Sequence, residues 1–226
     1  MEILVVDTET TGIDPETDDI IEIAAILWSI SHKSILIQVS TLISKNIDIV
    51  NHAEPINKIS PDLLKMIFPQ NLVIELINQM SCSAKYICAH NADFDKKFCK
   101  KVIGLGISQL NWIDTQDIRY PNSEYCRGTS LSNLAIAHGI PIVDSHRALE
   151  DCKTLSKLLS LVPNLEEELK RASRPKVLVR SLEERPGTLS KKHGFKWNSI
   201  IQNSWAKYIP EEDIKTLPFS ARKVEF

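Results

Sequence analysis

The chain has 226 residues, with 43% hydrophobic and 25% charged side chains and a formal net charge of −2. This is the composition of an ordinary soluble globular protein, long enough for one sizeable α/β domain and a small appendage. The sequence has no apolar run of about eighteen residues and no secretory signal pattern, so we expect neither a membrane span nor export, and we predict a cytoplasmic protein.

The cysteines of the chain form no Cys-x-x-Cys pair, and their number is odd. Both facts argue against a disulfide framework and against a zinc site. We therefore expect buried, reduced thiols at Cys82, Cys88, Cys99, Cys126 and Cys152.

Charge is distributed unevenly along the chain. Residues 1–170 carry 15 Lys/Arg and 23 Asp/Glu, a net charge of −8, whereas residues 171–226 carry 12 Lys/Arg and 6 Asp/Glu, a net charge of +6. A basic appendage often binds a polyanion, but a solvated surface can have the same composition. The split alone therefore assigns no function.

The first part of the chain predicts three β-strands in succession. Residues 3–8 are an apolar run, and the β-rich stretches 19–30 and 34–44 follow it after short breaks. Short breaks between consecutive strands favour antiparallel pairing. Glu22 lies among the apolar residues of the second strand, so we expect it near an edge or an end of the sheet.

From about Ser60 onward, helical patterns alternate with short strands. Ser60 followed by Pro61 is a helix start signal. Three strands followed by this alternation predict an α/β fold, a mixed β-sheet flanked by helices. The predicted helices cover residues 71–80, 93–104, 129–139 and 145–162, and the predicted strands cover 86–90 and 111–115.

Three regions are expected along the chain. Residues 1–165 form one large domain, and residues 166–176, which are charged and lie near prolines, form a linker. Residues 177–226 form a small basic α+β module with a short helix stopped by Gly194, two short strands and a final helix at Pro210.

Two carboxylates stand at the end of the first strand. Asp7 and Glu9 are two positions apart, so their side chains point to the same face. Like charges in this arrangement require a lysine, an arginine or a metal ion between them. The first strand therefore predicts a site that holds positive charge.

Two further segments supply acids at the starts of helices. Asp95 follows a short strand, and His146 and Asp151 stand five residues apart at the start of a long helix. Five residues correspond to about 500° of helix rotation, so His146 and Asp151 converge only if His146 precedes the regular helix. Asp144 or Ser145 as the N-cap would allow this.

Three motifs now resemble a known family. Residues 7–12 (DTETTG), 90–95 (HNADFD) and 146–151 (HRALED) are similar to the three exonuclease motifs of the DnaQ-like DEDDh 3′–5′ exonucleases. The motifs occur in the family's order, and the resemblance spans about residues 1–160. It implies a ribonuclease-H-like fold and a 3′–5′ exonuclease that uses two divalent cations, Mg²⁺ or Mn²⁺.

The resemblance also implies a role for each matching residue. Asp7, Glu9 and Asp151 would hold one metal ion, Asp7 and Asp95 would hold the second, and His146 would be the general base. Carboxylate oxygens are the ligands that Mg²⁺ prefers, and a two-metal site suits phosphoryl displacement.

Further residues of these motifs would contact or support the substrate. The turn formed by Thr10, Thr11 and Gly12 would approach the terminal nucleotide, while Asn91 and Phe94 would support the site. His90 is expected to be structural rather than a ligand.

Lysines and aromatic residues alternate in the basic tail. Cations follow phosphates and aromatic faces stack on unpaired bases, so we expect Lys192, Lys196 and Trp197 to contact a nucleic-acid strand. A competing interpretation is that Trp197 and Trp205 form the core of the small module.

The expected function is hydrolysis of single-stranded DNA from its 3′ end to nucleoside 5′-monophosphates, with DNA favoured over RNA. An exoribonuclease or oligonucleotide phosphodiesterase would use the same site. A catalytically silent protein that binds nucleic acid or a partner is an alternative of another class, although all four acids are present. Homodimerisation or association with replication and repair proteins stays open.

Overall fold

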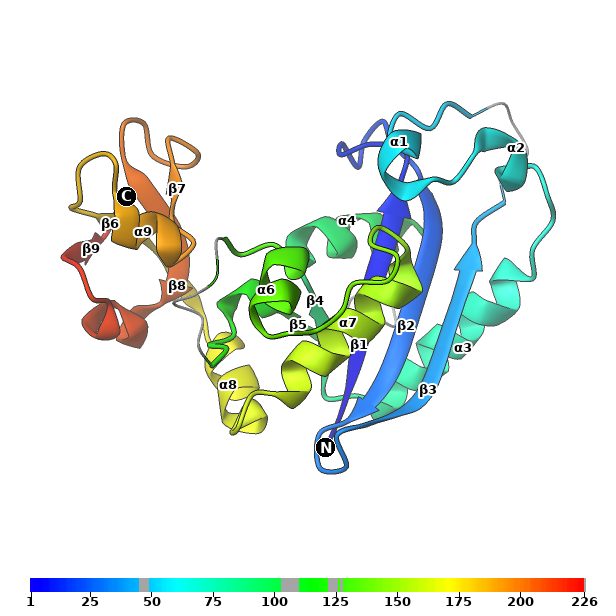
Figure 1. Ribbon diagram of the computed structural model, residues 1–226, viewed down its shortest axis with the longest axis horizontal. Coiled ribbons are helices and arrows are strands. Elements are labelled where there is room, and N and C mark those ends of the chain that lie inside the picture. Colours follow the sequence, from blue (N-terminus) through cyan, green and yellow to red (C-terminus); the bar gives the residue numbers. More distant parts are fainter. Residues whose placement is uncertain (45–48, 103–109, 122–125, 127, 226) are drawn as a thin grey trace.

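The computed structural model describes residues 1–44, 49–102, 110–121, 126 and 128–225. Over these residues the chain forms a larger N-terminal α/β part and a smaller C-terminal part that lies beside helices α6 and α8 (Figure 1). The predicted end of a helix at Gly104 lies outside the described residues.

The larger part is built on a mixed sheet with the strand order β3-β2-β1-β4-β5. The first three strands pair antiparallel, and β4 and β5 extend the sheet in parallel with β1. The prediction of antiparallel pairing followed by alternating helices and strands is confirmed. The strands are β1 (Glu2–Thr10), β2 (Ile20–Ser29), β3 (Ser34–Leu42), β4 (Tyr86–Ala89) and β5 (Asn111–Asp114).

This topology gathers three chain segments at one edge of the sheet. The carboxyl ends of β1 and β4 lie at the same edge because these strands run parallel. Strand β2 runs the other way, so its beginning joins them there, with Glu22 directly opposite Glu9. The polar residues at the ends of three buried strands therefore meet.

Helices cover both faces of the sheet (Figure 1). Helices α3 and α4 pack on one face through Ile77, Met80 and Phe98, and helices α6, α7 and α8 pack on the other. A short 3₁₀ helix over Thr115–Asp117 follows β5. The α-helices of this part are α1 (Glu54–Asn57), α2 (Pro61–Leu64), α3 (Gln70–Ser83), α4 (Ala92–Val102), α6 (Leu131–Ala137), α7 (Ala148–Ser160) and α8 (Leu165–Ala172).

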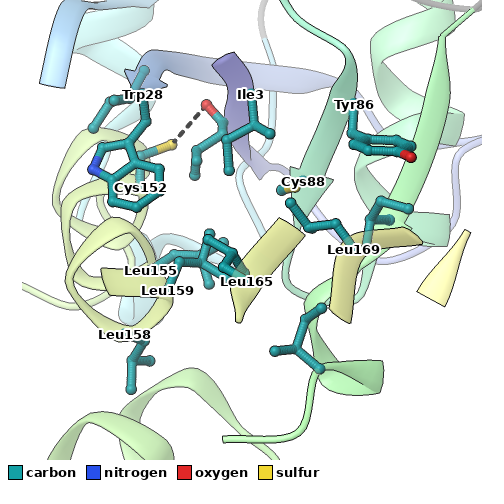
Figure 2. Packing of buried hydrophobic residues seen from close by; sticks show 14 of the residues in the cluster. Ile3, Trp28, Tyr86, Cys88, Cys152, Leu155, Leu158, Leu159, Leu165 and Leu169 are labelled. Atoms are coloured by element: carbon teal, nitrogen blue, oxygen red, sulfur yellow. Dashed lines mark hydrogen bonds between the residues drawn. The ribbon is translucent and has the colours of Figure 1, made fainter. Parts of the chain in front are cut away.

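Helix α7 anchors the larger core. Its apolar residues recur at helical spacing, and Cys152, Leu155 and Leu159 turn toward β1 and β2 (Figure 2). Trp28 of β2 packs in the same cluster. Burial of such side chains contributes about 1.5–3 kcal/mol each, which fixes α7 against the sheet.

The segment expected as a linker is largely helical. Helix α8 occupies Leu165–Ala172, and its Leu165 and Leu169 are buried in the same core cluster as helix α7 (Figure 2). The charged residues dominate the composition of this segment, but its leucines four positions apart form one apolar stripe. The chain between the two parts is therefore short, and only residues 173–175 separate α8 from the next strand.

The C-terminal part has a sheet and a small core of its own. Its strand order is β7-β8-β6-β9, and Val179, Phe195, Trp205 and Ile209 are buried together. At least one tryptophan thus serves as core. The final predicted helix is a 3₁₀ helix over Glu211–Thr216. The other elements are β6 (Lys176–Ser181), α9 (Thr188–Lys192), β7 (Lys196–Trp197), β8 (Trp205–Pro210) and β9 (Ala221–Lys223).

Among the described residues, no helix combines the length and the apolar character that crossing a membrane requires.

Candidate active site

Acidic side chains from three elements meet at the sheet edge where β1 ends. Asp7 and Glu9 come from β1, Asp95 from the first turn of α4, and Asp151 from the first turn of α7. One ligand atom each from Glu9, His146 and Asp151 lies within 4.8 Å of the other two. The structure therefore brings Glu9, His146 and Asp151 together, and Asp7 is near enough to Asp95 and Asp151 for their charges to raise its pKa.

The electrostatics of these acids show how closely they are grouped. Burial, followed by the charges of Asp95 and Asp151, raises the pKa of Asp7 well above its usual range. Burial and the charge of Asp151 raise the pKa of Glu9 to about 8. Burial likewise raises the pKa of Asp95 to about 7. The folded chain alone thus leaves negative charge uncompensated at this edge.

Asp95 is held in place by a neighbour on the central strand. The Thr8 hydroxyl donates a hydrogen bond of 2.8 Å to Asp95 Oδ1, and both residues are buried. Thr8 lies between Asp7 and Glu9 but faces the opposite side of β1, where α4 packs. This hydrogen bond favours the ionised carboxylate and opposes part of the effect of burial.

His146 precedes the regular part of α7, as its convergence with Asp151 requires. Its φ of 64° is in the left-handed region, and its backbone N–H donates a 3.0 Å hydrogen bond to Asp151 Oδ2. The side chain of His146 is exposed, so the imidazole lies on the solvent side of the acids.

The expected N-cap of α7 is wrong. The capping position is Arg147 rather than Asp144 or Ser145, and the Arg147 side chain makes no cap hydrogen bond. Instead, the carboxylate of Glu22, on β2, accepts a 3.1 Å hydrogen bond from the Ala148 backbone N–H. A residue 126 positions away thus replaces the local cap.

Sequence reasoning placed Glu22 near an edge or an end of the sheet but did not predict its partners. Arg147 donates to both Glu22 oxygens, from Nε at 3.0 Å and from Nη2 at 2.9 Å. Glu22 and Glu9 are opposite each other on β1 and β2, an arrangement that is unfavourable for like charges. Arg147 compensates for this repulsion between Glu9 and Glu22. In the sequence, the signal for such a pairing is an acidic residue within an otherwise apolar strand.

Positive charge is still needed at this cluster. Arg147 lowers the pKa of Glu9, but its guanidinium is bonded to Glu22, and the pKa of Glu9 remains at about 8. The four carboxylates of this cluster are the kind of ligand that suits Mg²⁺ or Mn²⁺. The residues therefore fit divalent cations.

The turn after β1 has a fixed shape. Thr11 Oγ1 donates a 3.2 Å hydrogen bond to Asp18, and the Asn57 side chain donates to the Thr10 carbonyl at 3.2 Å. A Cβ added to Gly12 would lie 2.4 Å from Asp18 Oδ2, so a larger residue there would have to displace the Asp18 side chain. Thr10, Thr11 and Gly12 thus form a rigid border of the acidic cluster.

Asn91 and Phe94 lie at the start of α4, which also carries Asp95. Asn91 has a φ of 76° and an exposed side chain, and its backbone N–H donates to Asp114 at 3.1 Å. Phe94 is partly buried, with its ring 4.8 Å from that of Phe98. His90 is bonded through Nδ1 to Thr115 and through Nε2 to the Thr129 carbonyl, in line with a structural role.

The tail residues singled out from the sequence are not part of the acidic cluster. Lys192, Lys196 and Trp197 line a separate groove between the C-terminal part and the segment before α6. Lys207, which belongs to the same basic pattern, is bound to Asp117 of the larger part at 3.2 Å.

The fold and the acidic edge define a ribonuclease-H-like protein with a candidate metal-dependent site. The profile of the family RNase_T, described as exonuclease, matches residues 4–159. The chain therefore belongs to this exonuclease family, and its assignment to the DnaQ-like 3′–5′ exonucleases is confirmed. A second profile, a domain of unknown function (DUF8626), matches residues 180–224.

Curated relatives and solved structures agree with this assignment. The chain is 32% identical over 160 residues to a 3′-5′ exonuclease DinG of Staphylococcus aureus (strain MRSA252), a match that covers 70% of this chain but only 18% of that protein. It is similar in fold to an Escherichia coli exonuclease I–single-stranded DNA complex, with a TM-score of 0.65, 19% identity, and coverage of 84% of this chain and 50% of that one.

A further structure, of exonuclease X in complex with 5′ overhanging duplex DNA, has a TM-score of 0.57 and 22% identity, and the match covers 76% of this chain and 99% of that one. The predicted mixed sheet of the ribonuclease-H-like type, flanked by helices, is confirmed.

Proposed function

We propose that this chain is a metal-dependent 3′–5′ exonuclease that hydrolyses the terminal phosphodiester of single-stranded DNA and releases nucleoside 5′-monophosphates. The observation that carries the proposal is the convergence of Asp7, Glu9, Asp95 and Asp151 with His146 at one sheet edge. The DinG relative, named as a 3′-5′ exonuclease, and the exonuclease I complex with single-stranded DNA support it.

Two divalent cations, Mg²⁺ or Mn²⁺, would be held by these acids, one by Asp7, Glu9 and Asp151 and the other by Asp7 and Asp95. When bound, they would neutralise the acids and stabilise charge that develops on the attacking and leaving oxygens. Uncompensated carboxylates of raised pKa are consistent with this role.

His146 would take the proton from the attacking water. Its imidazole is exposed at the mouth of the cluster, and its backbone N–H is fixed by Asp151, which holds the residue beside the acids. Imidazole is a suitable base near neutral pH. The rigid Thr10–Gly12 turn and the exposed Asn91 would border the terminal nucleotide, with Phe94 packed behind them.

The same site could serve RNA or short oligonucleotides, because the 2′-hydroxyl is read by contacts that the acids themselves do not make. The exonuclease family assignment and the DNA-bound neighbours support DNA as the first substrate to test. A cytoplasmic location, homodimerisation and association with replication or repair proteins remain predictions from the sequence.

Digestion of 5′-labelled single-stranded DNA and RNA, with Mg²⁺, Mn²⁺ or EDTA, tests the proposal. We expect a ladder that shortens from the 3′ end only when metal is present, and faster on DNA. Asp7→Asn should reduce turnover by at least roughly 10²–10³-fold, the cost of removing one preorganised electrostatic group.

Degradation in EDTA, or normal turnover by Asp7→Asn, would contradict the metal-dependent mechanism. Faster digestion of RNA would assign an exoribonuclease. Binding without any degradation would assign the catalytically silent alternative.

A further inference from the structure

A groove of about 560 Å³ separates the C-terminal part from the segment that precedes α6. This volume is in the range of about 300–1,000 Å³ that is typical of ligand sites. One wall is formed by Gly128 and Thr129 and the other by residues of α9, β7 and β8. The two walls thus come from the two parts of the chain.

The groove is positively charged. Lys191, Lys192 and Lys196 line it and are exposed, and no aspartate or glutamate belongs to its described lining. None of these three lysines forms an ion pair with any described residue of the chain. Lys207, by contrast, is bound to Asp117. Within the described part of the chain, these three lysine charges are therefore not neutralised, and they favour an external anion.

An aromatic surface accompanies these charges. Trp197 is partly exposed at the groove, and its ring packs edge-on against Trp205 at 5.5 Å. The Arg185 guanidinium covers the Trp197 ring at 4.6 Å. A base entering the groove would stack on the face of the Trp197 ring that Arg185 leaves uncovered, and such aromatic faces bind unpaired bases without sequence preference.

One wall of the groove is bonded to the end of β4, next to the helix that carries Asp95. His90 Nε2 is 2.6 Å from the carbonyl oxygen of Thr129, which belongs to the groove wall. His90 follows β4 directly and stands next to Asn91, at the start of the helix that carries Asp95. The groove wall and the acids are thus fixed to the same end of β4.

The C-terminal part is held in the position that forms the groove. Arg171 of α8 donates to Glu168, to the Asp117 carbonyl and to Asp213 of the C-terminal part. Lys176 and Lys207 both bind the Asp117 carboxylate, whose side chain is 8% exposed. These contacts fix the lysines of the groove relative to the sheet edge.

From these observations we infer that the groove binds single-stranded DNA upstream of the 3′ end that occupies the acidic cluster. The three lysines contact phosphates, and Trp197 stacks on a base. This inference rests on the proposed exonuclease function for the direction of the strand. The binding itself is measured independently of cleavage.

The test measures binding of fluorescein-labelled dT20 to the full chain in EDTA, where the proposed hydrolysis does not run. The triple variant Lys191→Ala, Lys192→Ala, Lys196→Ala should bind at least about tenfold more weakly at low salt. Its slope of log affinity against log salt should be smaller by about 2, from three phosphate contacts at about 0.7 each. Trp197→Leu should bind at least about fivefold more weakly.

Lys215→Ala is the matched control. Lys215 is an exposed lysine of the same part of the chain and lies outside the groove lining. The affinity of the Lys215→Ala variant for dT20 and its salt slope should equal those of the wild type. The inference would be overturned if the triple variant kept the wild-type affinity and salt slope for dT20. It would also be overturned if the triple variant lost affinity for a blunt 20-base-pair duplex as strongly as for dT20.

Cleavage assays on the same preparations separate this inference from the proposed function. Lysine-dependent binding by a wild-type protein that degrades nothing supports the groove and refutes the exonuclease. If degradation depends on metal but binding does not depend on the lysines, DNA binding in the groove is refuted and the proposed exonuclease function is supported.

Discussion

Glu22 and Arg147, 125 residues apart in the chain, form a two-point ion pair at the turn that carries His146. The Glu22 side chain is 5% exposed, and its carboxylate also accepts the Ala148 backbone N–H. Glu22 therefore has its charge compensated by Arg147, caps α7 and fixes the residue after His146.

Glu22→Ala should destabilise the protein by about 2 kcal/mol, because it removes the cap of α7 and leaves Arg147 without its carboxylate. Turnover should fall more than the folded fraction does, since the His146 turn loses its support. Urea unfolding and single-turnover rates at full folding measure the two effects.

Asp144→Asn is the control for Glu22. Asp144 forms an exposed ion pair with Lys58 two residues before His146, and such pairs contribute only about 0–1 kcal/mol. Equal losses in the free energy of unfolding for Glu22→Ala and Asp144→Asn would show that Glu22 stabilises the protein no more than an exposed ion pair does.

The metal-free protein should lose stability as the pH rises from about 4.5 to 8. Burial raises the pKa of Glu9 to about 8, so the native state keeps a proton that the unfolded chain releases near pH 4.5. The free energy of unfolding therefore falls with pH over this window, by no more than about 5 kcal/mol for this group.

Added Mg²⁺ should reverse this loss, because it binds the ionised carboxylates, and its stabilising effect should grow with pH. Chemical denaturation from pH 4.5 to 8.5, with EDTA or with Mg²⁺, measures both trends. A free energy of unfolding in EDTA that rises from pH 4.5 to 8.5 would contradict the raised pKa of Glu9.

Thr8→Val should raise the Mg²⁺ concentration needed for half-maximal activity at pH 7. The Thr8 hydroxyl favours the ionised form of Asp95, whose pKa is about 7, so its loss raises this pKa further. The difference from wild type should shrink at pH 9, where the carboxyl ionises in either protein. Thr8→Ser, which keeps the hydroxyl, should behave like wild type, and a pH-independent defect in Thr8→Val would point to packing instead.

Arg171→Met should weaken the contact between the two parts of the chain. The Arg171 side chain is 9% exposed and binds Glu168 and Asp213. Its removal leaves the partly buried Asp213 without this partner and leaves Glu168 with Arg119 alone, at a cost of about 1.5–3 kcal/mol. Faster proteolysis of the connection at 173–175, together with a lower midpoint in urea, would report this loss.

Arg174→Ala provides the comparison for Arg171. The Arg174–Glu212 pair also joins the two parts of the chain, but it is exposed and should contribute about 0–1 kcal/mol. Similar proteolysis rates in the two variants would show that Arg171 does not hold the C-terminal part.

The sequence by itself determined the strands of the large sheet, the main helices that flank it and the motif acids, but it predicted only two of the four strands of the C-terminal part. Apolar periodicity fixes which residues an element buries, and Asp7 and Glu9 share a face because side chains alternate along a strand. The requirement that His146 precede the regular helix also followed from helix geometry alone, and the structure shows it.

Only the tertiary structure decided the contacts between distant segments. Glu22 rather than a local residue caps α7, helix α8 joins the core where composition indicated a linker, and Lys207 binds Asp117 while Lys192 stays available. The physical reason is that these outcomes depend on which side chains packing brings within hydrogen-bonding distance and removes from water. Local pattern and composition carry no measure of that proximity.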